Sequence, residues 1–184
     1  MLFHLFETNF GTCAIGWNDI GLARVQLPES TPAETEARMI AANMTSAPAT
    51  LPSFAREARD ALLAYFSGEA VAMEDLVLDY SLVSPFNALI YRALRGVPRG
   101  EIVSYGDLAK EIGQPGAARA VGIVMSKNPW PVVVPCHRVI GANGKLTGFS
   151  AYGGVDTKLS LLTLEGTQFG DTPGLFDDPF FSEE

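Results

Sequence analysis

Cysteine and histidine are scarce in this sequence, with only two of each among 184 residues. A metal site is not expected, because these four residues are scattered and lack the paired spacing of zinc ligands: His4, Cys13, Cys136 and His137. No other cofactor is expected. The two cysteines could form one disulfide, but nothing else in the composition is typical of a secreted, disulfide-rich scaffold.

Long apolar runs are absent as well. No stretch approaches the roughly 20 apolar residues that a bilayer-spanning helix needs, so no membrane partner is expected. Residues 1–7 lack the basic region and the cleavage site of a signal peptide. Because a free reactive thiol needs a reducing compartment, we expect a cytoplasmic protein, or a nuclear one in a eukaryote.

Basic charge is in deficit, since the net charge is −8, and this argues at first against a nucleic-acid partner. The charge is unevenly distributed, however. Residues 1–84 carry four basic and eleven acidic side chains, residues 85–166 carry nine and five, and the last eighteen residues carry five acids and no base. A basic middle segment of net charge +4 is compatible with DNA binding by one face, although ordinary charge segregation would also produce it.

The sequence predicts an α/β domain over residues 1–83, the first half of the chain. Alternating apolar and polar positions with turn signals predict a three-stranded antiparallel sheet, with strands at 2–7, 12–17 and 20–26. Thr31 and Pro32 predict the start of a helix that runs to about residue 44, and apolar residues at four-residue spacing predict a second helix that ends near Gly68. Residues 69–82 are expected to form another strand or an extended linker.

The second half is expected to be a mostly α-helical domain over residues 84–166. One helix precedes Gly96, and a last helix is predicted over residues 153–165. Between them, a glycine-bearing turn joins two short helices at 104–113 and 117–125, which is the pattern of a helix-turn-helix, although many helical hairpins bind nothing. Residues 167–184 are expected to be an acidic, flexible tail.

The most informative stretch is residues 131–140. Three consecutive valines at 132–134 predict a buried strand, and Pro135 forces the chain out of it. Cys136 and His137 follow directly. A thiol held at a strand end beside a histidine that helps to deprotonate it can serve as a nucleophile. For an arbitrary Cys-His pair, a buried structural cysteine beside a surface histidine would be the preferred interpretation.

The run from Pro135 to Ile140 resembles the active-site segment of methylated-DNA–protein-cysteine methyltransferases, which are O6-alkylguanine-DNA repair proteins. Further segments have that family's order and spacing: Ser104-Tyr105, residues 117–122, Asn128-Pro129, and Gly153-Gly154 leading to Lys158, Leu161-Leu162 and Glu165-Gly166. The match covers residues 84–166, and over 1–83 it is a match of pattern only. The resemblance implies a ribonuclease-H-like N-terminal domain and a winged-helix-like helix-turn-helix in the C-terminal domain.

The resemblance also implies catalytic roles. Cys136 takes the alkyl group, His137 acts through a water molecule as general base, and Glu165 holds the imidazole. Tyr105 assists the leaving guanine at N3, and Asn128 joins the recognition helix to the active-site segment. Without the resemblance, the interpretations would be simpler. Glu165 would be a solvated carboxylate at a helix end, Tyr105 a tyrosine packed on the core, and Asn128 a helix C-cap.

The implied partner is double-stranded DNA that contains O6-alkylguanine, bound by a monomer through the minor groove. Arg119, next to Ala118 at the start of the second short helix, takes the role of an arginine finger that fills the gap left by the extruded nucleotide. A phosphate contact or a plain surface position is the alternative for Arg119. Arg138 is either a DNA ligand or, as we favour, a mainly structural ion-pair donor.

The loop at residues 148–154 departs from the family's pattern, because it is longer by about two residues. Phe149 or Tyr152 is the candidate aromatic wall of the base pocket, and Ser150 is a candidate backbone donor to O6 of the base. The backbone carbonyls of Cys136 and Val139 are expected to accept from the exocyclic amine of guanine, which favours guanine over adenine.

The implied function is stoichiometric repair, in which the alkyl group of O6-alkylguanine passes irreversibly to Cys136, with O4-alkylthymine as an open second substrate. A non-catalytic lesion sensor and an alkylation-responsive transcription regulator are the alternatives. Cys136 argues against the first, and the lack of a second DNA-binding domain argues against the other. A thiol hydrolase is a further alternative, and it is disfavoured because it would release its product, whereas the alkyl group is expected to stay on the protein. Residues 174–176 faintly resemble a sliding-clamp-binding peptide, but incidental apolar residues in an acidic tail are the simpler interpretation.

Overall fold

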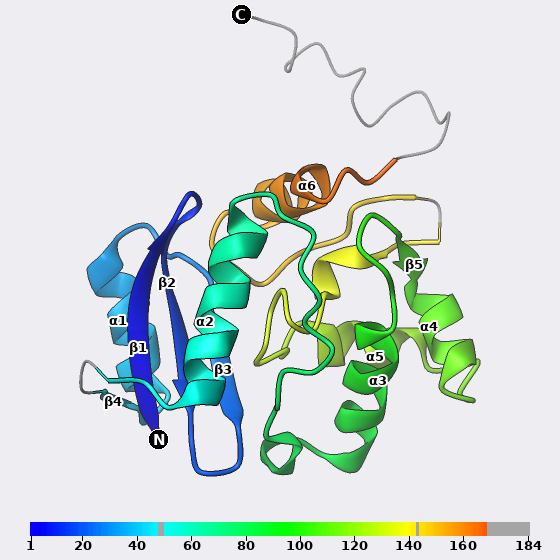
Figure 1. The fold of residues 1–184 in the computed structure, drawn as a ribbon. Helices are drawn as coiled ribbons and strands as arrows, with labels where there is room; N and C mark the ends of the chain where they lie inside the picture. Colours follow the sequence, from blue (N-terminus) through cyan, green and yellow to red (C-terminus); the bar gives the residue numbers. More distant parts are fainter. Residues whose placement is uncertain (48–49, 143, 169–184) are drawn as a thin grey trace, which may run out of the picture.

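The structure, a computed structural model, describes residues 1–47, 50–142 and 144–168 (Figure 1). Its main sheet has the strand order β3-β2-β1-β4, with β1, β2 and β3 antiparallel and β4 parallel to β1. The strands are β1 (Leu2–Thr8), β2 (Gly11–Trp17), β3 (Leu22–Gln26) and β4 (Thr45–Ser46). The predicted three-stranded meander is therefore confirmed. The fourth strand was not predicted, because two residues are too few to produce an alternating pattern.

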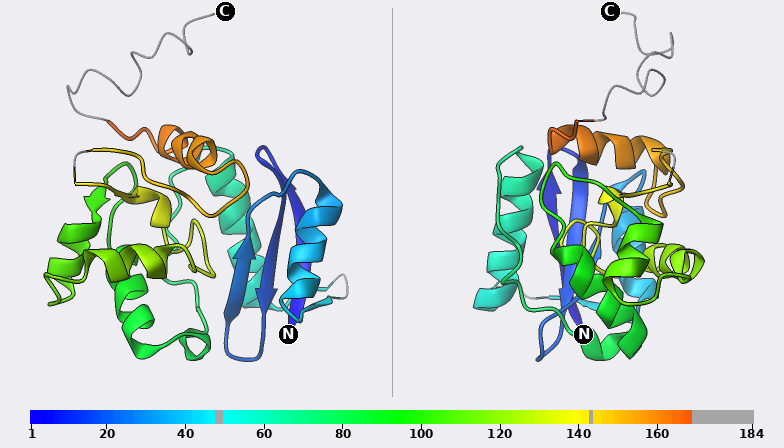
Figure 2. Two further views of the ribbon diagram at one scale, coloured as in Figure 1. Left: turned by 180° about the vertical axis from the view of Figure 1, so that it is seen from behind. Right: turned by 90° about the vertical axis from the view of Figure 1, so that its right-hand side faces the viewer.

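Two helices cover opposite faces of this sheet (Figure 2), namely α1 (Pro32–Ala41) and α2 (Ser53–Phe66). Side chains alternate between the faces along β2. Ile15 belongs to the core cluster that includes α2, whereas Ala14 packs with Met39 of α1. Thr31 caps α1 as predicted, because its hydroxyl accepts from the backbone N–H of Glu34 at 3.2 Å.

An extended segment leads from α2 to the second half of the chain. It bonds to the edge of the sheet at Leu22, whose N–H donates to Val77 O at 2.8 Å and whose carbonyl accepts from Asp79 N at 2.9 Å. The expected strand or linker over residues 69–82 is thus an extended segment with one isolated bridge. A short 3₁₀ turn, η1 (Tyr80–Leu82), then precedes α3 (Pro85–Arg95).

The predicted helix pair is confirmed as α4 (Tyr105–Glu111) and α5 (Ala118–Met125). The Ser104 hydroxyl caps α4 by accepting from Asp107 N at 3.0 Å. A small parallel pair, β5 (Val103–Ser104) with β6 (Val139–Ile140), joins the segment before α4 to the segment after Cys136. The last helix is α6 (Val155–Leu164).

The predicted buried strand at residues 132–134 is wrong. The three valines are buried, but they form a turn: Val132 has φ +73°, and Val134 N donates to Trp130 O at 2.7 Å. Trp130 also donates from Nε1 to Leu22 O at 2.9 Å, which anchors the segment to the edge of the main sheet. β-branched residues here reflect burial rather than a strand backbone, so Cys136 follows a packed turn and not a strand end.

One cluster of buried apolar side chains extends from Cys13 in the main sheet to Leu161 in α6. The active-site segment therefore packs against residues from both halves of the chain. No helix in the described part of the chain is long and apolar enough to cross a membrane. Most of the predicted tail, including residues 174–176, lies outside the described residues.

Candidate active site

Cys136 opens a 3₁₀ turn, η2 (Cys136–Arg138), and only 6% of the residue is exposed. Its Sγ accepts a hydrogen bond from Nδ2 of Asn128 at 3.1 Å, and the same amide group donates to Val134 O at 2.8 Å. Oδ1 of Asn128 accepts from Trp130 N at 3.0 Å. Asn128, which follows α5, therefore fixes both the thiol and the turn that precedes it.

The surroundings of Cys136 keep it protonated at rest. Burial raises the pKa of the Cys136 thiol, and the hydrogen bond from Asn128 and the charge of Lys158 only partly oppose this. Lys158 is itself fully buried, and its Nζ donates to Val139 O at 2.6 Å and to Thr147 O at 3.3 Å. Because burial lowers the pKa of Lys158 to about 8, its charge near the thiol is also costly to hold. Forming the thiolate therefore needs a base.

His137, the next residue in the chain, is the candidate for that base. Its side chain is fully buried, and Nε2 lies 2.7 Å from Oε1 of Glu165. Since an ionised carboxylate only accepts, the proton lies on Nε2 and the lone pair of Nδ1 is available. Nδ1 is buried and has no hydrogen-bond partner among the described residues. Burial lowers the pKa of His137, against the opposing effect of Glu165, so the imidazole is neutral, as a base must be.

Glu165, directly after α6, is held as an anion. Arg138 binds it with two hydrogen bonds of 2.8 Å, from Nε to Oε2 and from Nη2 to Oε1, and Nη1 of Arg138 donates to Val97 O at 2.6 Å. Burial alone would raise the pKa of Glu165, but the hydrogen bonds from His137 and Arg138 lower it well below its usual value. This buried ion pair engages the guanidinium of Arg138, as expected for the favoured structural role.

Tyr65 of α2 belongs to the same network, and the sequence did not predict it. Its hydroxyl donates to Oε1 of Glu165 at 2.8 Å and lies 3.4 Å from Nε2 of His137. The available signal was weak: Tyr65 lies beside the apolar Leu62 and Phe66 on the buried face of the predicted helix, where a phenol needs a polar partner.

A cavity of about 80 Å³ lies beside Cys136. Phe149 and Ser150 line it as predicted candidates, and the following residues complete it: Arg24, Val25, Gln26, Leu27, Asn128, Pro131 and Ala151. Strand β3 thus forms one wall, which the sequence did not indicate. The side chain of Val139 is fully buried away from the surface, and its carbonyl already accepts from Lys158.

Tyr152 does not line this cavity, so of the two candidate aromatic walls only Phe149 lies beside Cys136. It is 56% exposed and lines a different groove, against α1. The next two residues, Gly153 and Gly154, have φ of +80° and +55°, and Thr157 Oγ1 donates to the carbonyl of Tyr152 at 2.5 Å.

The remaining predicted residues lie on the helix pair. Arg119 is exposed at the second position of α5, after the half-buried Ala118. The Tyr105 hydroxyl forms a 2.9 Å hydrogen bond with Oγ1 of Thr147, and its ring lies beside Gly122 of α5. The structure therefore pairs four of the predicted catalytic residues, Asn128 with Cys136 and His137 with Glu165, and holds Tyr105 through the loop that carries Thr147.

Comparison with known proteins agrees with this geometry. Residues 85–167 match the family model described as "6-O-methylguanine DNA methyltransferase, DNA binding domain". The methylated-DNA–protein-cysteine methyltransferase of Mycolicibacterium paratuberculosis is 51% identical over 114 residues, which are 62% of this chain and 67% of the relative. That of Methanosarcina acetivorans is 46% identical over 114 residues, 62% and 70% of the two chains. The chain belongs to the methylated-DNA–protein-cysteine methyltransferase family.

The fold of this methyltransferase agrees with the assignment over nearly its whole length. The crystal structure of Mycobacterium tuberculosis OGT in complex with DNA is 35% identical in sequence and superposes with a TM-score of 0.73. The match covers 90% of this chain and 92% of that one. The chain is thus a methyltransferase that repairs methylated DNA directly, with a protein cysteine as acceptor.

Asn128→Ala is expected to raise the pKa of the methyltransferase's Cys136 further, because the thiolate loses a charge-assisted hydrogen bond. The rate at which a small thiol reagent alkylates Cys136, followed from pH 6 to 10, measures this pKa. Asn87→Ala, on α3, is the control that should leave it unchanged. An unchanged profile in Asn128→Ala would show that the amide only orders the turn.

Proposed function

We propose that this protein repairs O6-alkylguanine by moving the alkyl group to Cys136, and that each molecule reacts once. The observation that carries the proposal is a buried thiol, held by Asn128, beside a neutral His137 whose far nitrogen is bonded to an ionised Glu165. This arrangement supplies a nucleophile and its base without any cofactor. Both cysteines are free, as such a reaction requires, and a reducing compartment such as the cytoplasm would keep them so.

The proposed step is a displacement at the alkyl carbon. The thiol proton passes through a water molecule to Nδ1 of His137, and the ionised Glu165 stabilises the resulting imidazolium. The sulfur then forms the new S–C bond while the O6–C bond breaks. The electron pair of the broken O6–C bond stays on guanine. Tyr105 donates a proton or a hydrogen bond at N3 of that guanine. Because the thioether has no good leaving group, the cysteine is not regenerated.

The proposed DNA contact uses α4 and α5 as a winged-helix-like helix-turn-helix in the minor groove, bound by a monomer. The exposed Arg119 would fill the gap left by the extruded nucleotide, and Phe149 and Ser150 would line its pocket next to Cys136. The backbone carbonyls of Cys136 and Val139 remain the proposed acceptors for the guanine amine. In this proposal, residues 84–166 form the reacting domain and residues 1–83 a ribonuclease-H-like domain that supports it.

Stoichiometry tests the proposal. With excess duplex that contains O6-methylguanine, the amount of restored guanine should rise to one equivalent of protein and stop. A hydrolase would exceed one equivalent, and a lesion sensor would bind the duplex without restoring any guanine. Either outcome would overturn single-use transfer.

Arg119→Ala is expected to slow repair of duplex DNA by about tenfold or more, while reaction with the free O6-alkylguanine base stays unchanged. The reason is that only the duplex demands unstacking, at a cost of a few kcal/mol that the arginine offsets in part. Arg56→Ala, an exposed arginine on α2, is the matched control. Equal losses with duplex and free base would rule out the finger role.

A further inference from the structure

We propose that Tyr65 is a positioning residue for alkyl transfer: its hydroxyl, carried by α2, orients Glu165 and so fixes His137 as the base for Cys136. The inference rests on the proposed function. It assigns to the N-terminal part of the chain a direct share in the chemistry, beyond structural support.

The geometry at Glu165 shows how the hydroxyl acts. Oε1 accepts three hydrogen bonds, from Tyr65 at 2.8 Å, from His137 at 2.7 Å and from Arg138 at 2.8 Å. Tyr65 also lies 3.4 Å from Nε2 of His137, so it contacts both members of the pair. The hydroxyl therefore sets the direction in which the carboxylate oxygen faces the imidazole.

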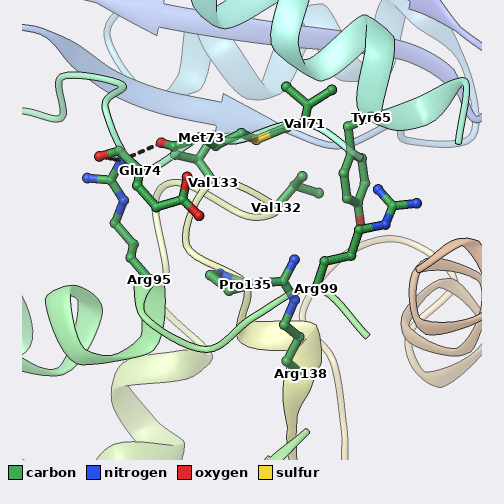
Figure 3. A pocket seen from close by; sticks show the side chains of 10 residues that line it. All are labelled: Tyr65, Val71, Met73, Glu74, Arg95, Arg99, Val132, Val133, Pro135 and Arg138. Carbon is green, nitrogen blue, oxygen red and sulfur yellow. Dashed lines mark hydrogen bonds between the residues drawn. The ribbon is translucent and has the colours of Figure 1, made fainter. Parts of the chain in front are cut away.

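The ring of Tyr65 is rigidly held, which a positioning role requires. The residue is 2% exposed, and its ring meets Phe66 edge-on, with centroids 5.3 Å apart. The guanidinium of Arg99 lies 5.4 Å from the ring centroid. Figure 3 shows Tyr65 reaching from α2 into a small cavity, of about 50 Å³, that Arg99 and Arg138 also line.

Arg99 ties the same two elements together through their backbones. It donates to Gly68 O at 3.1 Å and to Glu69 O at 2.7 Å, just after α2, and to Leu164 O at 2.7 Å, at the end of α6. The end of α2 and the end of α6 are thus joined twice, once by Arg99 and once by the bond from Tyr65 to Glu165. This double link fixes the distance over which the Tyr65 hydroxyl reaches the carboxylate.

The electrostatics keep Tyr65 a donor. Burial, and then the charge of Glu165, raise the pKa of Tyr65 far above the working range, so the phenol stays neutral. A neutral donor that shares Oε1 with His137 weakens the attraction of the carboxylate for the imidazolium. Without it, the pKa of His137 should rise, and the base should remain protonated, and therefore inactive, up to a higher pH.

The other ionisable groups around this pair are cations, the Cys136 thiol and the carboxyl group of Glu74, which lines the same small cavity as Tyr65 but forms no hydrogen bond with the pair. Arg138 lies in η2, Arg99 follows α3, Lys158 lies in α6, and Cys136 opens η2. Among the described residues, the only acid in the network is Glu165 itself. Removal of the Tyr65 hydroxyl therefore changes the one negative group that stabilises protonated His137.

Tyr65→Phe tests the inference. Reaction with duplex and with the free O6-alkylguanine base should both slow by about tenfold, and the acidic limb of the pH–rate profile should move to higher pH. Tyr91→Phe is the matched control, because its buried hydroxyl donates to Val124 O at 2.9 Å and does not contact Glu165. It should lose similar thermal stability and keep the wild-type profile with the free base. An unshifted profile in Tyr65→Phe would overturn the inference.

A double-mutant cycle separates positioning from general packing. If Tyr65 acts through Glu165, then Tyr65→Phe should cost no further rate in a Glu165→Gln background. A full tenfold additional loss would contradict the inference. The two proposals also fail separately: a wild-type protein that transfers no alkyl group refutes the function, whereas an active wild type with an equally active Tyr65→Phe refutes only the role of Tyr65.

Discussion

Cys136→Ala is expected to abolish alkyl transfer completely, whereas Cys13→Ala should retain it. Only two thiols are present, and they differ in their surroundings. Cys13 is fully buried in β2, and burial raises its pKa to about 12, so almost no thiolate forms near neutral pH. Cys136 has a hydrogen-bond donor to its sulfur, a histidine as its neighbour in the chain and a cavity beside it. Restored guanine in the oligonucleotide is the measurement.

Binding provides the control for Cys136→Ala. The substitution removes one sulfur atom and leaves Arg119 and the helix pair in place, so the Kd for alkylated duplex should stay close to that of the wild-type protein. Loss of both binding and transfer would indicate that Cys136→Ala is misfolded. The experiment would then be repeated with Cys136→Ser. Guanine restored by Cys136→Ala would show that another group accepts the alkyl.

Glu165→Ala is expected to lower the free energy of unfolding by about 3–5 kcal/mol, because it leaves the Arg138 guanidinium buried without its counter-charge. It should also remove most of the transfer activity, since His137 loses the acceptor at Nε2. Glu165→Gln keeps an acceptor oxygen and should destabilise the protein less. Urea unfolding, with Glu111→Gln as a surface control, measures the difference. Equal stability of Glu165→Ala and the wild type would contradict the ion pair's importance.

The same ion pair makes stability depend on pH. Because the folded pKa of Glu165 is depressed, its contribution is complete above the ordinary value of 4.5 and is lost as pH falls toward the folded pKa. His137 acts in the same direction at higher pH, since a folded pKa lowered from 6.5 means that protonation below that pH favours unfolding. Glu165→Gln should therefore flatten the acid side of the stability curve.

The parts of the site that are close in sequence were predictable. Caps such as Thr31 and Ser104 are local, and they set the starts of α1 and α4 close to their expected positions. Cys136 and His137 are adjacent, and their pairing alone suggested a nucleophile; Asn128, eight residues before the thiol, was given its role only by the family resemblance. Glu165, 28 positions beyond His137, was predicted only through the family resemblance, because no local pattern joins the two.

What the sequence did not reveal depends on tertiary contacts. Tyr65 lies 100 positions from Glu165, and only the packing of α2 against the end of α6 brings the two together. The turn at residues 132–134 is imposed by Trp130 and its bond to the sheet, against the strand preference of valine. The choice between Phe149 and Tyr152 as the aromatic wall likewise needed the folded loop, which brings only Phe149 to the cavity beside Cys136.

The most direct test of Cys136 as the consumed acceptor is the intact mass of the protein after reaction with excess duplex that contains O6-methylguanine. The expected result is a gain of one methyl group per molecule, with no second addition at longer times, and peptide mapping should locate that group on Cys136. A restored guanine without any gain in protein mass, or a methyl group on another residue, would contradict transfer to Cys136.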